Sequence, residues 1–318
     1  MLYIASVISV LLIFGIIYQY IITKSEQNKF SVPGKLIDIG GFKLHMIYNH
    51  CNSTGATVIL ESGSAASALD WAYVQPAVAE FANVLSYDRA GLGWSDESPY
   101  PRTSQQIVSE LHDLLNAARI TPPYILVGHS FGGLNMQLFA NTYPNDIMAV
   151  VLVDSAHEEL DKINAFKINS SRIFFRLVLK GTYYFGLVRL LGRWIKNPIF
   201  NVISSDDKNG YLANISANKY MRTIEQEGLI HMKESLDQLK YSESKLKEIP
   251  LIVITAGKQN MGFNDKDKAT WSQLQRDLVS KSSQGSQLIA EQSGHMVPYT
   301  QPEIIITAIK SLIIKNLP

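Results

Sequence analysis

Short apolar runs alternate with amphipathic stretches along most of this chain. The runs are rich in Val, Ile and Leu, as buried strands are, and lie at residues 57–60, 84–87, 124–127, 149–153, 251–255 and 287–290. Between them, stretches such as residues 103–118 repeat their apolar side chains at helical spacing, with Thr103 or Ser104 as the candidate cap. Strands that alternate with helices predict an α/β fold with a mostly parallel, doubly wound sheet.

The amino-terminal pattern differs, because residues 2–22 are almost entirely apolar and Gln19 is their only strongly polar side chain. A helix of about 20 residues spans about 30 Å, the hydrocarbon thickness of a bilayer. A cleaved signal peptide is the alternative, but no basic residue precedes the run and no Ala-x-Ala follows it. We therefore predict a single-pass membrane protein with a transmembrane anchor at residues 1–23. Lysines after the run favour a cytoplasmic catalytic domain.

One motif carries the chemistry. Gly-His-Ser-Phe-Gly-Gly at residues 128–133 follows an apolar run and precedes a stretch of good helix formers. Gly-x-Ser-x-Gly between a strand and a helix is the sequence of a nucleophile elbow, in which a sharp turn exposes the serine hydroxyl. This context predicts Ser130 as a nucleophile and the amide of Phe131 as an oxyanion donor. The alternative is a glycine-rich turn without chemistry.

Two further motifs support a family resemblance. Tyr-Asp-Arg-Ala-Gly-Leu-Gly-Trp-Ser lies at residues 87–95, and Ser-Gly-His lies at residues 293–295. With the elbow, they resemble the α/β-hydrolase superfamily, specifically its esterase and lipase-like members. The resemblance implies an eight-stranded α/β-hydrolase sheet, with core halves at residues 24–157 and 250–318. It also implies that the Asp-Arg pair braces its loop.

The loop after the strand at residues 57–60 carries the second oxyanion amide in the resembled family, usually after His-Gly. Here Ser62 and Gly63 stand in that place, so the resemblance implies that Ser64 donates the second N–H. A loop of small residues that only turns the backbone is the alternative.

The resemblance also suggests the remaining catalytic groups. His295 follows the last apolar run, which gives the chain order nucleophile, acid, histidine and predicts this imidazole as the base. The commonest position of the acid holds Asn260, whose neutral amide cannot stabilise an imidazolium as a carboxylate does. We therefore expect the acid at Asp154, at the end of the preceding strand, with Asp265 and Asp267 as the alternatives.

The alternation of strands and helices stops at residues 158–249, where the resembled family inserts a helical cap. Residues 162–205 interleave lysines and arginines with aromatic and aliphatic side chains and contain no acidic residue. A basic amphipathic stretch is typical of binding to a membrane surface. An ordinary cap whose apolar face lines the pocket fits the same pattern, so both interpretations stay open.

Composition narrows the function classes. The formal net charge is +1, so nothing global indicates a nucleic-acid partner, and the single Cys51 cannot form an internal disulfide. The sequence shows no metal-ligand cluster or phosphate-binding loop, so we expect neither a metal nor an organic cofactor.

The prediction is a membrane-anchored serine hydrolase acting on small-molecule or lipid esters. A thioesterase, an acyltransferase and a non-catalytic ligand-binding protein on the same fold are the alternatives.

Overall fold

The computed structural model describes residues 2–26, 29–51, 55–163, 170–192, 194–258 and 261–315. In these ranges the strands form one eight-stranded sheet with the order β1-β2-β4-β3-β5-β6-β7-β8. Within this sheet β2 runs antiparallel to both of its neighbours, β1 and β4, and the other adjacent pairs are parallel, which confirms the predicted mostly parallel fold. The strands are β1 (Lys35–Asp38), β2 (Lys43–Asn49), β3 (Thr57–Glu61), β4 (Asn83–Tyr87), β5 (Tyr124–His129), β6 (Ile147–Val153), β7 (Leu251–Ala256) and β8 (Gly285–Ala290).

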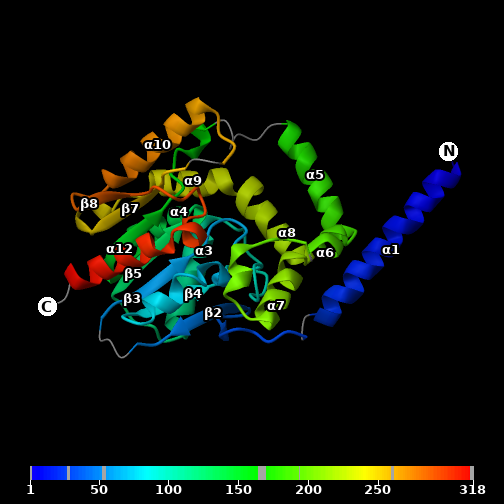
Figure 1. Ribbon diagram of the computed structural model, residues 1–318, viewed down its shortest axis with the longest axis horizontal. Coiled ribbons are helices and arrows are strands. Elements are labelled where there is room, and N and C mark those ends of the chain that lie inside the picture. The colour runs from blue at the N-terminus through cyan, green and yellow to red at the C-terminus, as the bar shows by residue number, and fades with distance from the viewer. Residues whose placement is uncertain are drawn as a thin grey trace.

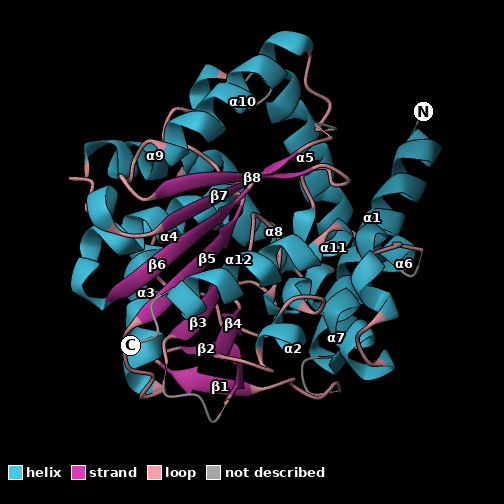
Figure 2. Ribbon diagram, turned by 60° about the vertical axis from the view of Figure 1, so that its left-hand side comes forward, coloured by secondary structure: helices cyan, strands magenta, loops and turns pink. Residues whose placement is uncertain are grey.

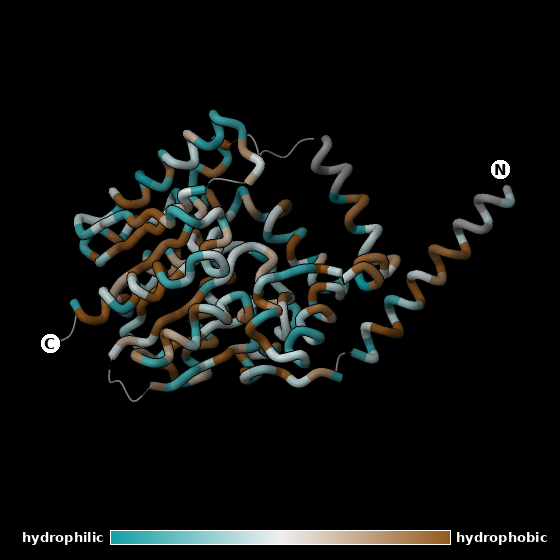
Figure 3. Tube along the Cα trace, in the orientation of Figure 1, coloured by the Kyte–Doolittle hydropathy of each residue, from teal (hydrophilic) through white to brown (hydrophobic). Residues whose placement is uncertain are grey.

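The central strands are buried on both faces, which is why their sequences are apolar without interruption. Successive side chains enter different halves of the core: Ile59 and Leu126 pack in one half, and Leu60 and Val127 pack in the other. Figure 3 shows hydrophobic residues along these strands. The first half lies under α3 (Ser104–Ala117), α4 (Phe131–Thr142), α9 (Met232–Tyr241) and α10 (Asp265–Val279), and the second under α2 (Gln75–Val78) and α12 (Pro302–Lys315).

The described residues between β6 and β7 form helices joined by short irregular segments and contain no strand, and Figures 1 and 2 show these helices beside the sheet. We call them the inserted helices: α5 (Ser170–Tyr184), α6 (Leu187–Gly192), α7 (Ser205–Ile215), α8 (Asn218–Glu225), a π-helix (Gln226–Ile230) and α9. The predicted cap and its limits at residues 158 and 249 stay a prediction.

The helix α1 (Leu2–Glu26) corrects one prediction. Among the described residues, no helix combines the length and the apolar character that crossing a bilayer requires. The single-pass membrane protein predicted from residues 1–23 is therefore wrong, and the cytoplasmic assignment that depended on it is withdrawn with it. Figure 1 shows where α1 approaches the protein, at α6 and α7, before its N-terminal half diverges from them.

The polar side chains of α1 explain this outcome, because they pack on the inserted helices. The amide of Gln19 is 1% exposed and donates to the carbonyl oxygen of Ser216 at 2.8 Å. Arg189 on α6 donates to the side chains of Gln19 and Thr23, each at 3.0 Å, and pairs with Glu26. In a hydropathy profile these residues are isolated polar positions in an apolar run. In the structure they form the surface through which α1 packs on the inserted helices.

Candidate active site

The predicted elbow is a sharp turn in the structure. β5 ends at His129, α4 begins at Phe131, and Ser130 between them has φ 53° and ψ −123°. A positive φ is strained for a residue with a side chain and is held here by its neighbours. The Ser130 N–H donates to the carbonyl oxygen of Val153 at 3.1 Å, and the Ser130 carbonyl oxygen accepts from Gly133 and Ala156.

Glycines make this turn possible. A Cβ atom at Gly128 would lie 2.6 Å from the carbonyl oxygen of Gly132, and one at Gly132 would overlap the carbonyl oxygen of Glu61. Any side chain at either position would therefore push apart β3, β5 and α4. The sequence motif requires glycine here because of close backbone approach.

Three of the predicted site residues come together at the carboxyl ends of the strands. The Nε2 atom of His295 lies 3.0 Å from Oγ of Ser130, and its Nδ1 atom lies 2.7 Å from Oδ2 of Asp154. Because a carboxylate only accepts, Nδ1 carries the proton and Nε2 is free to accept from the serine hydroxyl. This chain of contacts is the one that removes a proton from a serine in acyl transfer.

Asp154 is held firmly at the end of β6. It is 1% exposed, and its Oδ1 atom accepts from the amide of Ala256 at 3.2 Å and from the indole N–H of Trp271 at 3.1 Å. These two donors leave Oδ2 aimed at His295. The carboxylate is therefore oriented by β7 and α10 before any substrate binds.

The alternative acids lie at the start of α10. Asp265 has a fully exposed side chain that sits 3.5 Å from Lys268. Asp267 is buried in the first helical turn, where its N–H donates to the side chain of the cap residue Asn264 at 2.8 Å. The structure thus brings Asp154, rather than the exposed Asp265, to the imidazole. Asn260 lies outside the described residues.

His129 is a residue that sequence reasoning missed, because its position inside Gly-x-Ser-x-Gly accepts many side chains. Its Nε2–H donates to the carbonyl oxygen of His295 at 2.8 Å, and the two rings lie 4.8 Å apart. Burial, reinforced by the nearby His295, lowers the pKa of His129 to about 3. His129 is therefore neutral at physiological pH and secures the loop that carries His295.

The loop at residues 62–66, which we call the oxyanion loop, lies against the elbow. A Cβ atom at Gly63 would come within 3.2 Å of Cβ of Ser130, so the two backbones are close. Ser64 is exposed and lines the same cavity as Ser130. Phe131 begins α4, and the first N–H groups of a helix have no partner within it. The donor roles of the Ser64 and Phe131 amides stay a prediction.

The cavity beside Ser130 is small, about 170 Å³, and polar groups lie in its wall. Asp70 is buried there and accepts from the amide of Ser67 at 2.5 Å and from the hydroxyl of Tyr299. Burial, opposed by the hydrogen bonds from Ser67, raises the pKa of Asp70 to about 7.

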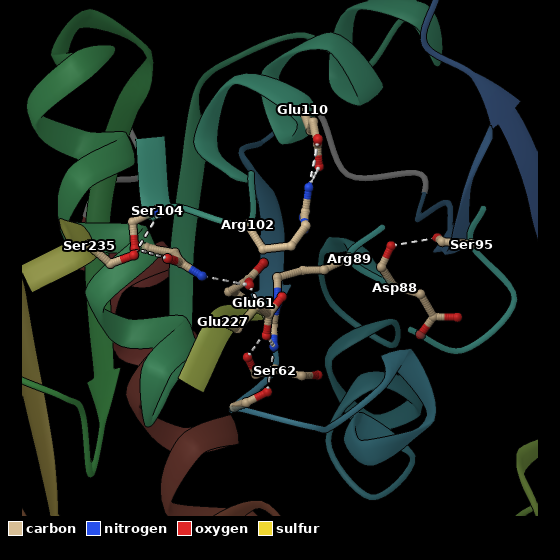
Figure 4. A network of polar contacts seen from close by, with 12 residues as sticks. Glu61, Ser62, Asp88, Arg89, Ser95, Arg102, Ser104, Glu110, Glu227 and Ser235 are labelled. Atoms are coloured by element: carbon tan, nitrogen blue, oxygen red, sulfur yellow. Dashed lines mark hydrogen bonds and ion pairs between the residues drawn. The ribbon is translucent and has the colours of Figure 1, made fainter. Parts of the chain in front are cut away.

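The Asp-Arg pair after β4 braces the loops around the site (Figure 4). Asp88 accepts from the amides of Ala68 and Trp94 at 2.7 and 2.9 Å. Arg89 donates to the carbonyl oxygens of Ser62 and Gly63 at 2.7 and 2.9 Å. Arg89 therefore fixes the backbone of the oxyanion loop directly.

A parallel sheet of this order, with a serine elbow after β5, is the α/β-hydrolase architecture. The model of the alpha/beta hydrolase family matches residues 58–308, and the chain belongs to this family. This membership confirms the resemblance noted in the sequence, and it supports an enzyme of the hydrolase kind.

Relatives and solved structures agree with that membership. The uncharacterized protein YqjL of Bacillus subtilis is 25% identical over 276 residues, which cover 86% of this chain and 90% of the relative. An AB hydrolase superfamily protein of Gibberella zeae is 25% identical over 283 residues, 80% of this chain and 85% of the relative. The epoxide hydrolase CorEH has a TM-score of 0.62 and 17% identity, covering 88% and 98% of the two chains. A bromoperoxidase from Bacillus anthracis has a TM-score of 0.61 and 18% identity, covering 89% and 99%.

Proposed function

We propose that this protein is a serine hydrolase that cleaves carboxylic esters through an acyl-enzyme. The observation that carries the proposal is the contact chain from Ser130 through His295 to Asp154, built on a strained elbow. A serine at the elbow favours acyl transfer, because a hydroxyl with an adjacent base is an activated nucleophile.

The proposed reaction has two halves. Oγ of Ser130 attacks the ester carbonyl carbon while Nε2 of His295 takes the hydroxyl proton. The amides of Phe131 and Ser64 hold the tetrahedral oxyanion. His295 then gives its proton to the leaving alkoxide oxygen, the C–O bond breaks, and the acyl group stays on Ser130. A water molecule, deprotonated by His295, attacks that acyl group and releases the acid, and the proton returns to Oγ.

The size of the cavity bears on the substrate. The cavity that the described residues line beside Ser130 has a volume of about 170 Å³. A short acyl group fits that space, whereas a long acyl chain would have to extend beyond it. Among the ester classes that the sequence leaves open, we therefore expect short acyl groups to be preferred.

The deciding experiment measures hydrolysis of p-nitrophenyl esters of graded acyl length by the full chain and its variants. We expect the highest rate on short acyl groups, and a loss of about 10⁴-fold in both Ser130→Ala and Asp154→Asn. Asp265→Asn is the matched control, because it removes the exposed carboxylate that the sequence offers as an alternative acid, and its rate should equal that of the wild type. Equal rates in wild type and Ser130→Ala would refute the proposal.

A second measurement distinguishes the proposed hydrolase from a non-catalytic ligand-binding protein on the same fold. A fluorophosphonate probe phosphonylates an activated serine and reacts poorly with an ordinary hydroxyl. We expect labelling that Ser130→Ala abolishes. A folded wild-type protein that resists the probe would favour the binding protein. Turnover of acyl-CoA, or transfer of the acyl group to an alcohol, would instead indicate the thioesterase or the acyltransferase.

A further inference from the structure

The guanidinium group of Arg89 links three parts of the protein (Figure 4). It donates to Glu61 at the end of β3, to two carbonyl oxygens of the oxyanion loop, and to both carboxylate oxygens of Glu227. All five of its N–H groups are used, which is the full capacity of an arginine. Because the fork is planar and rigid, the position of each partner constrains the others.

Glu227 supplies the part of this link that comes from the inserted helices. It lies in the π-helix at Gln226–Ile230, is fully buried, and accepts from Nε and Nη2 of Arg89 at 2.9 Å each. Burial alone would lower the pKa of Arg89, but the carboxylates of Glu227 and Glu61 outweigh it, so that the pKa is raised. A π-helix is rare and often marks a functional position. Without Glu227, two buried donors of Arg89 would lose their partner.

A second contact from the inserted helices reaches the same loop. The hydroxyl of Tyr220 on α8 donates to the carbonyl oxygen of Ala65 at 2.7 Å. Ala65 has φ 61°, a left-handed conformation that side chains other than glycine rarely adopt. The loop is thus held in an unusual shape from both ends, at residues 62 and 63 through Arg89 and at residue 65 through Tyr220.

We propose that Glu227 and Tyr220 are positioning residues for the oxyanion loop. The packing of the inserted helices against this loop would then determine how well its amide stabilises the transition state. This inference rests on the proposed function. An oxyanion exists only after the nucleophile has attacked, so a displaced loop amide weakens the transition state more than substrate binding. The signature of this role is a fall in kcat with KM nearly unchanged.

The first test compares Glu227→Gln with the wild type on the preferred ester. Gln keeps the size of the side chain but removes the charge and turns an NH₂ group toward Arg89. We expect kcat to fall about 10- to 100-fold, with KM changed by less than about threefold. The matched control is Arg222→Gln, which breaks an exposed ion pair between α8 and Glu97 that does not touch the oxyanion loop. Its kcat should equal that of the wild type.

A second variant and a second measurement make the test complete. Tyr220→Phe removes one hydroxyl group, and should lower kcat in the same way even if Glu227→Gln does not fold. Hydrogen–deuterium exchange of the peptide at residues 61–68 reports on the loop independently of catalysis, and should rise in both variants but not in Arg222→Gln. If the wild type hydrolyses no ester but exchange rises, the positioning stands and the proposed function fails. Unchanged exchange and an unchanged kcat in folded variants would overturn the inference.

Discussion

At the scale of single residues, the site depends on groups whose charge is set by burial. Asp154 is buried but has two fixed donors besides His295, whereas Asp70 sits in the cavity wall beside Tyr299. His129 stays neutral because its pKa is about 3. Asp70 and His129 line the same cavity, and burial shifts the pKa of each toward its neutral form.

Asp70 gives the clearest pH dependence. Its pKa is about 7 in the folded protein against a usual 3.8, so the folded state binds this proton more tightly than the unfolded chain. The stability that results is complete below pH 3.8 and is lost as the pH rises through about 7. We expect the Tm of the wild type, relative to that of Asp70→Asn, to fall as the pH rises from about 4 to about 7. Calorimetry across that range checks this, and a constant difference would contradict it.

Much of the site could be predicted from local sequence, and the rest could not. Ser130 follows from its motif between a strand and a helix, whereas His295 and Asp154 follow from the family resemblance, which implies a histidine after the last strand and an acid at a strand end. The structure brings the three together, while their catalytic roles remain the proposal. Glu227 and Tyr220 carry no local signal, because their partners lie 138 and 155 residues away in the chain.

At the scale of elements, the sequence predicts the strands and helices whose apolar pattern and capping residues are local in the chain. The six apolar runs are strands of the sheet; the central ones are apolar without interruption because they are buried on both faces, whereas β8 is an edge strand and only partly buried. The helix predicted at residues 103–118 is α3, with Thr103 as its cap. The membrane anchor predicted from the length and apolar character of residues 2–22 is wrong, since no described helix meets the requirements for crossing a bilayer, and polar positions of α1 pack against distant helices.

The cap of α3 offers a test at this scale. The side chain of Thr103 accepts from the amide of Gln106 at 3.3 Å, which satisfies one of the free N–H groups of the first turn. We expect Thr103→Ala to lower the free energy of unfolding by about 1 kcal/mol. Thr270→Ala, at an exposed position inside α10, is the control and should change it by less than about 0.5 kcal/mol. Urea denaturation measures both, and equal losses would argue against the cap.

At the scale of the whole molecule, α1 packs on the inserted helices, which it contacts at α5, α6 and α7. Gln19 donates to Ser216 and Asn218 and accepts from Arg189, so one buried amide joins α1 to α6, to α8 and to the segment between α7 and α8. The far half of α1 diverges from the protein in Figure 1. The attachment is therefore local, and a single side chain contributes much of its specificity.

Gln19→Ala tests this attachment. It removes the donor to the Ser216 carbonyl oxygen and the acceptor of the Arg189 Nε–H, and the loss of a partner costs about 1–3 kcal/mol for a buried group. We expect limited proteolysis to release α1 several times faster, with the sheet left intact. Ile17→Ala, at a half-exposed neighbouring position, should leave the rate unchanged. If both variants are cleaved at the wild-type rate, the Gln19 contacts do not hold α1.

The position of α9 divides the inserted helices into two parts that differ in how much their sequence is constrained by the core. Leu236 and Leu239 of α9 belong to the main core, and its Ser235 accepts from the amide at the start of α3 at 3.0 Å. α9 is thus the crossover that any parallel pair of strands needs between β6 and β7. The helices before it are an addition to that crossover. We expect that this addition can be exchanged as a module without loss of the crossover, provided that the new module keeps a carboxylate against Arg89.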